Sequence, residues 1–166
     1  MGQTLYGARL WQSDGGEPEL RYDAVGKNSE VFASNDIVGV SSGQLLVATS
    51  AVVGVVVKTQ TMASTNTTVA KVYPGFIPVY DDQLWLMSTD SDLTGNSTDA
   101  GTYYMVTGGT GAQLVKVSAG VATTTNRTVE IVKVDPYNEG GSGAGSGLRK
   151  VLVRILKTPY TNITAS

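Results

Sequence analysis

The stretch YPGFIPVYDDQLWLMST, Tyr73 to Thr89, places an apolar run on each side of a short acidic break at Asp81-Asp82. Aromatic and β-branched residues flanking a polar break are typical of two strands joined by a tight turn. In the second run Leu84 and Leu86 alternate with Trp85 and Met87, which is the two-residue period of a strand. The stretch therefore predicts a β-hairpin, and we expect this hairpin to be the structural centre of the fold.

The chain before this stretch also carries strand and turn signals. Residues 27–58 are rich in Val, Leu and Ile and contain polar turn signals at positions 34–36, 41–43 and 49–50, spaced as in a meander or small barrel. The run AVVGVVV, Ala51 to Val57, lacks alternation, which predicts a central strand covered on both faces. Gly54 inside this run predicts a bulge or a close backbone approach.

The last third alternates between apolar and polar residues. The segments AQLVKVSAG, RTVEIVKVD and LRKVLVRILK each show the pattern of half-buried antiparallel strands. Residues 136–147 are rich in glycine and predict a flexible loop between the last two strands. No stretch longer than a turn or two shows helical spacing. We therefore expect an all-β protein, with a small β-barrel or β-tulip domain over residues 24–158 and a C-terminal tail over residues 159–166.

The first 23 residues predict an extended N-terminal arm with one apolar patch before a glycine-containing break, SDGGEP. Burying a large apolar side chain is worth about 1.5–3 kcal/mol, so the patch is expected to dock, either on its own domain or on another subunit. Tyr, Trp and Arg are enriched at binding hot spots. The candidate partner-binding residues are Leu5, Tyr6, Arg9, Leu10 and Trp11.

The composition excludes several kinds of chemistry. The chain of 166 residues contains no histidine and no cysteine, so a Ser-His-Asp triad, a His-ligated zinc site, thiol catalysis and disulfides are excluded within it. The adjacent carboxylates Asp81 and Asp82 are interpreted as turn formers, because neighbouring residues in a strand-to-strand turn generally point apart. We expect no enzyme activity, catalytic residue, cofactor or metal site.

Charge and hydropathy also limit the partners. The formal net charge is −2, and the one dense basic segment, LRKVLVRILK, is interpreted as a strand with solvated or edge-guarding charges, so no nucleic acid partner is expected. The most apolar run, Ala51 to Val57, is too short to span a bilayer, and no membrane association is expected.

Taken in order, several short strings resemble one known family. They are GAR at residues 7–9, VFASNDIVGVSSGQL, VVGVVV, the turn IPVYDD leading into QLWLM, and the ending VEIVKVDP with RKVLVRI. Their order over most of residues 5–157 resembles the small capsid decoration, or cement, proteins of tailed bacteriophages. The chain departs from that pattern in its Thr-rich segment, 59–68, and its Gly-rich segment, 140–147.

The resemblance implies a β-domain, made in the host cytoplasm, that sits on the outer capsid surface of the virion. Its partners would be the major capsid protein and further copies of itself in a homotrimer, and its role would be head stabilisation. A cement protein needs no active site, because several weak contacts made together give lasting attachment. One alternative is another virion β-module, such as a head fibre base or a tail or receptor-binding domain. The other is a carbohydrate-binding or hydrolytic β-domain using Asp81, Asp82 and an exposed Trp85.

Overall fold

The computed structural model describes residues 5–91, 101–122, 126–134 and 149–156, and the regular elements in this part of the chain are all β-strands apart from one short helical turn. The larger sheet has six strands in the spatial order β1 (Arg9–Ser13), β9 (Gln83–Ser88), β13 (Lys150–Ile155), β12 (Val129–Val134), β10 (Tyr103–Thr107) and β11 (Leu114–Lys116). The smaller sheet has five, in the order β2 (Val25–Gly26), β5 (Gln44–Val47), β4 (Ile37–Ser41), β6 (Val52–Val56) and β8 (Phe76–Pro78). The predicted all-β class is confirmed.

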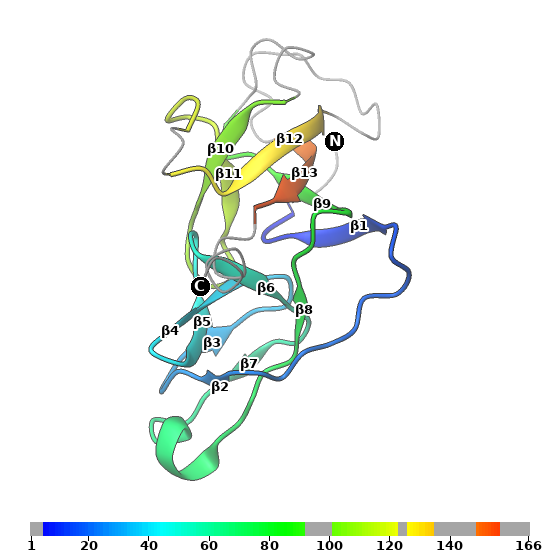
Figure 1. Cartoon of the computed structure of the whole chain (residues 1–166). Coiled ribbons are helices and arrows are strands. Elements are labelled where there is room, and N and C mark those ends of the chain that lie inside the picture. The colour runs from blue at the N-terminus through cyan, green and yellow to red at the C-terminus, as the bar shows by residue number, and fades with distance from the viewer. Residues whose placement is uncertain (1–4, 92–100, 123–125, 135–148, 157–166) are drawn as a thin grey trace.

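Two smaller elements lie beside the five-stranded sheet. Strands β3 (Val31–Phe32) and β7 (Gln60–Thr61) form a two-stranded ribbon, and η1 (Asn66–Ala70) is a single π-helical turn. Figure 1 shows the six-stranded sheet in the upper half of the molecule, the five-stranded sheet below it, and η1 at the lower tip. The Thr-rich segment 59–68 therefore contains a short strand and the start of η1.

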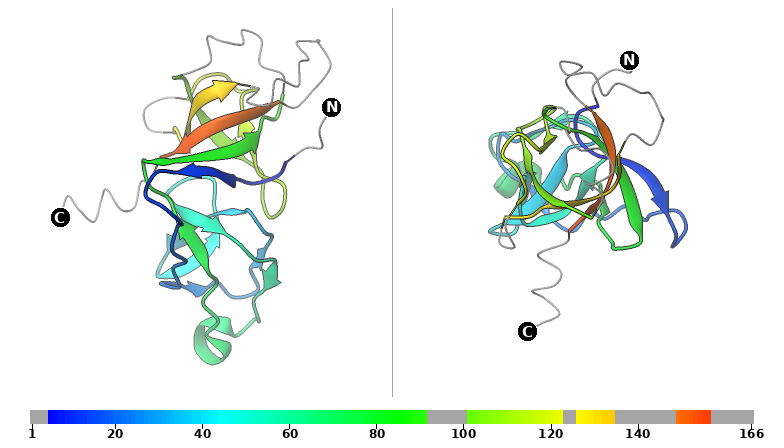
Figure 2. Two further views of the ribbon diagram at one scale, coloured as in Figure 1. Left: turned by 90° about the vertical axis from the view of Figure 1, so that its right-hand side faces the viewer. Right: turned by 90° about the horizontal axis from the view of Figure 1, so that it is seen from above.

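The six-stranded sheet is strongly curved. All its strand pairs are antiparallel, and its far strand β11 returns towards β9, where Thr89 forms a parallel bridge with Val115. The N–H of Asp90 donates to the carbonyl of Val115 at 2.9 Å. The view from above in Figure 2 shows this curl. The predicted barrel is therefore present as a curled half-barrel.

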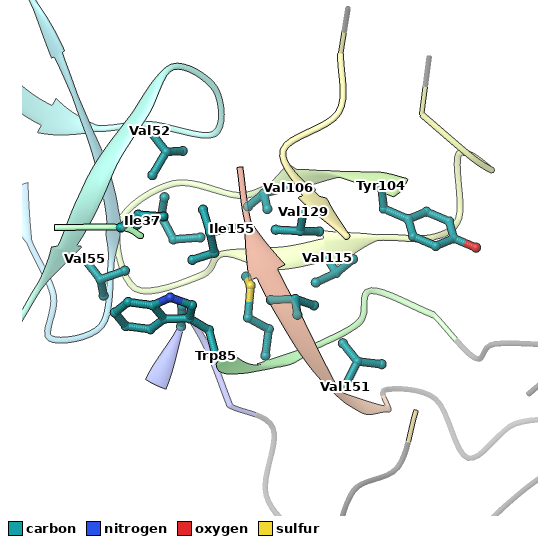
Figure 3. Close-up of a cluster of buried hydrophobic side chains, with 14 of the residues drawn as sticks. Ile37, Val52, Val55, Trp85, Tyr104, Val106, Val115, Val129, Val151 and Ile155 are labelled. Carbon is teal, nitrogen blue, oxygen red and sulfur yellow. The ribbon is translucent and has the colours of Figure 1, made fainter. Parts of the chain in front are cut away.

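Two apolar clusters lie on opposite faces of the five-stranded sheet. Along β4, Ile37 belongs to one cluster and Val38 to the other, as alternation along a strand requires. The first cluster packs this sheet against the half-barrel, and Figure 3 shows Ile37, Val52 and Val55 facing side chains of the larger sheet. The second cluster lies on the other face of the smaller sheet. It includes Phe32 of the two-stranded ribbon together with Val38, Leu45, Val53, Val56, Met62 and Phe76.

Strand β6 is the central strand that the sequence predicts. All five of its residues are buried, and it pairs with β4 on one side and β8 on the other. A Cβ on Gly54 would overlap the carbonyl of Ile77 and the ring of Phe76. The predicted close backbone approach at Gly54 is therefore confirmed. Val38 pairs with Gly54 and Gly39 with Val52, so Val53 is the extra residue of a bulge on β6 beside this glycine.

The hairpin predicted for residues 73–89 is wrong. Two strands do flank the Asp81-Asp82 turn, but β8 pairs with β6 whereas β9 pairs with β1 and β13. The stretch therefore crosses from one sheet to the other. The sequence pattern of a strand, a turn and a strand is the same in both arrangements, because it does not record which neighbours each strand pairs with.

The extended N-terminal arm is not confirmed. Within residues 1–23, β1 is a strand of the half-barrel, and Arg21 forms an antiparallel bridge with Phe76 at the edge of the smaller sheet. For the basic residues near the C-terminus, interpreted as solvated or edge-guarding, the edge position is wrong, since β13 lies between β9 and β12. The Gly-rich segment 136–147 and the tail 159–166 lie outside the described residues.

Candidate interaction surface

The candidate binding residues at the start of the chain divide between the interior and the surface. Leu5 and Leu10 are half-buried, and Leu10 packs against the larger apolar cluster. Tyr6 and Trp11 are 46% and 40% exposed, and Arg9 is also exposed. The segment is thus attached through one set of side chains and presents the other set to solvent.

Trp11 lies at an irregularity in the β1–β9 pairing. Leu10 pairs with Trp85 and Gln12 pairs with Leu84, so Trp11 is the extra residue of a β-bulge. A bulge redirects side chains and disturbs the pairing edge of a strand, and bulges are frequent at sheet edges. β1 is such an edge strand, since it has β9 as its one neighbour in the described sheet.

Residues Gly7 and Ala8 lie at the junction between the two sheets. The N–H of Gly7 donates to the carbonyl of Gln113 at 2.9 Å, and the N–H of Ala8 donates to the carbonyl of Asn35 at 2.8 Å. Gly7 has a φ of 77°, and a Cβ there would overlap the carbonyl of Asn35, so glycine is required. Ala8 is fully buried. These contacts fix the direction in which β1 leaves the junction.

Gln113 is the polar centre of this junction. Its side chain is fully buried, and its Oε1 accepts a hydrogen bond from the N–H of Ile37 at 2.6 Å. Its Nε2 donates to the carbonyls of Ile37 and Ala48 at 3.2 and 2.8 Å. One amide side chain from the half-barrel therefore satisfies backbone groups of the smaller sheet, where unpaired groups would be costly.

Asp36 makes a second polar connection between the same elements. Its carboxylate accepts the N–H of Ala33 at 2.8 Å and that of Gly111 at 2.9 Å. Burial raises the pKa of Asp36 above its ordinary value of 3.8, and the hydrogen bonds from Ala33 and Gly111 oppose that rise. The group therefore ties the turn before β4 to the β10–β11 loop.

The sequence predicts part of this junction. Asp36 belongs to the turn signal at 34–36, which is confirmed as a turn with Asn35 at a φ of 76°. Gln113 was missed, because a single glutamine beside a glycine- and threonine-containing stretch has no local signature. Its partners Ile37 and Ala48 are more than 60 residues away in the chain.

The acidic turn and Trp85 do not form a surface site. Asp81 and Asp82 are exposed, whereas Trp85 is 1% exposed and belongs to the larger apolar cluster. Its Nε1 has no hydrogen-bond partner in the described part of the chain. A buried indole cannot stack on a sugar ring at the surface, so this arrangement counts against the carbohydrate-binding alternative built on these three residues.

Comparison with protein-family models, with curated proteins and with solved structures gave no match. Among the described residues, no group of three or more Asp or Glu side chains is arranged to hold a metal ion. No helix in the described ranges is long and apolar enough to cross a membrane.

Proposed function

We propose that the protein is a virion structural protein that binds the outer surface of a tailed-phage head and stabilises the coat-protein lattice. The proposal rests on the resemblance of the strings in residues 5–157 to capsid decoration proteins. Its partners are the major capsid protein and further copies of this chain in a homotrimer. The all-β fold is compatible with this role, but it would serve other virion β-modules equally well.

The observation that supports a binding role most directly is the exposure of Tyr6, Arg9 and Trp11 on a segment that Ala8 and Leu10 attach to the core. Ala8 and Leu10 hold the backbone against the core, so the exposed side chains are presented from a fixed strand. A binding surface that is ordered beforehand loses less conformational entropy when its partner binds. These three residue types are also those most often found at hot spots.

The proposal is tested by co-sedimentation of the purified protein with expanded heads assembled from the coat protein of the same phage. The variant Tyr6→Ser/Arg9→Ser/Trp11→Ser changes the exposed side chains and leaves Ala8 and Leu10 in place. Since hot-spot residues contribute about 2 kcal/mol or more, we expect a loss of affinity of about 30-fold or more. The control is Tyr22→Ser/Val69→Ser/Tyr73→Ser, which changes exposed side chains in the region of the smaller sheet and η1.

The two possible failures are distinguishable. If the unchanged protein does not sediment with heads, the proposed function is wrong. If it does so and the Tyr6/Arg9/Trp11 variant binds equally well, the function stands and this surface is not the one that is used. Circular dichroism of each variant establishes that the fold is retained.

A further inference from the structure

The first strand is joined to the rest of the chain by an exposed segment that makes few contacts. Within the described part of the chain, residues 15–20 form no hydrogen bond, and the next fixed point is the bridge between Arg21 and Phe76. Gly16 has a φ of 90° and open space where a Cβ would be. This segment can therefore change direction without losing hydrogen bonds.

The backbone hydrogen bonds of Leu5, Gly7 and Ala8 and the strand ladder of β1 go to residues outside the connecting segment, and Gln12 makes one exposed side-chain contact with Asp14. The N–H of Leu5 donates to Ser88 Oγ at 3.0 Å, Gly7 and Ala8 bond to residues 113 and 35, and the strand ladder runs along β9. These backbone contacts do not involve residues 14–24, so a β1 from any copy of this chain would make the same ones.

We propose that residues 5–13 exchange between copies, so that a second copy of this chain supplies the β1 strand that pairs with β9. In the closed form each chain keeps its own β1, and in the exchanged form β1 makes the same contacts in another copy. The equilibrium between the two forms therefore depends on the connecting segment and on protein concentration. Residues 14–20 span roughly 23 Å when extended, which sets the reach to a neighbouring copy.

The exchange concerns the purified protein and does not depend on the proposed function. Opening requires Ala8 and Leu10 to leave the apolar cluster, so exchange is slow under conditions that favour the fold and faster near the unfolding midpoint. On a phage head, exchange would link neighbouring copies by a strand rather than by side-chain contacts alone.

The test uses the absence of cysteine in the chain. Two single variants, Gln12→Cys and Leu84→Cys, change residues that pair across β1 and β9. Equal amounts are mixed, held just below the unfolding midpoint, cooled and oxidised. Because each chain has one thiol, a disulfide that joins positions 12 and 84 can form only between chains, and mass spectrometry of the peptides identifies it.

The matched control is a mixture of Ser41→Cys and Gln44→Cys, which pair across the β4–β5 hairpin. β4 lies between β5 and β6, so exchange of this hairpin would require the smaller sheet to unfold. We expect at least five times more of the crosslinked heterodimer from the β1–β9 mixture than from the control mixture. Equal yields would overturn the proposal.

A second variant tests the role of the connecting segment. Deleting Gly15 and Gly16 shortens the connecting segment, which acts as the hinge of the exchange. A shorter hinge disfavours the closed form more than the exchanged form. We expect the dimer-to-monomer ratio, measured by light scattering after gel filtration, to rise at least tenfold. Circular dichroism establishes that the variant is folded, and an unchanged ratio in folded protein would contradict the proposed hinge.

Discussion

Replacing Gln113 by Leu should remove the polar connection between the two sheets while leaving their apolar packing in place. Leu has nearly the same volume as Gln, so the site stays filled, but the side chain can no longer accept from the N–H of Ile37 or donate to the carbonyl of Ala48. The carbonyl of Ile37 keeps a hydrogen bond from the N–H of Ala48 at 3.0 Å. One donor and one acceptor therefore lose the partner that Gln113 supplies.

The expected cost follows from those two groups. A buried donor or acceptor that loses its partner costs about 1–3 kcal/mol, and the added apolar contact of Leu offsets part of the sum, so we expect the free energy of unfolding to fall by about 2–4 kcal/mol. At about 2–4 °C per kcal/mol for a protein of this size, the melting temperature should fall by roughly 4–16 °C.

The assay is urea unfolding followed by circular dichroism and tryptophan fluorescence, with Gln44→Leu as the control. Gln44 is half-buried at the start of β5 and its side chain makes no hydrogen bond among the described residues, so its replacement should change stability by less than about 0.5 kcal/mol. If Gln113→Leu costs no more than Gln44→Leu, then the backbone groups of Ile37 and Ala48 do not depend on this side chain and the reasoning is refuted.

Substitutions at Trp85, Gly54 and Asp36 test three separate buried features. Trp85→Phe should cost less than about 1.5 kcal/mol in urea unfolding because the indole Nε1 has no described partner to lose, whereas Trp85→Ala should cost about 3–5 kcal/mol. Gly54→Ala should destabilise by about 1–3 kcal/mol by forcing a Cβ against the carbonyl of Ile77, and Gly109→Ala, which has open space around it, should stay within about 0.5 kcal/mol. Since burial raises the folded-state pKa of Asp36, the folded state binds more protons than the unfolded state between pH 3.8 and that raised pKa. Stability should therefore increase in this window as the pH falls, relative to Asp36→Asn, and unfolding of both proteins at about pH 7 and about pH 4 measures the difference.

Features that depend on a few neighbouring residues were predictable from the sequence. The turn at Ser41-Ser42-Gly43 joins β4 to β5, with Ser42 and Gly43 at positive φ as tight hairpins require. The continuous apolar run of β6 correctly predicted a strand buried on both faces. Both features depend on consecutive residues. The first is caused by a backbone conformation and the second by the lack of a polar face.

The position of the N-terminal segment was not predictable in the same way. Its apolar residues indicated that it docks, but they could not indicate where, because the receiving site is assembled from Asn35, Ser88 and Gln113. These residues are distant in sequence, and none of them has a side-chain type that signals a docking site. Gly7 is part of the same site, since its positive φ and its contact with Asn35 leave no room for a side chain, but a single glycine in the sequence does not indicate this.

The error at residues 73–89 shows how the two sheets come to share one core. A hairpin would have kept β8 and β9 in one sheet, with their side chains on common faces. Instead the chain turns at Asp81-Asp82, so that Ile77 of β8 and Trp85 of β9 reach the larger apolar cluster from different sheets. Gln83 fixes the turn locally, by accepting from the N–H of Tyr80 at 2.7 Å and donating to the carbonyl of Pro78 at 3.1 Å. Because the crossing is anchored in this way, the stretch that carries the strongest strand signal also determines how the half-barrel sits on the smaller sheet.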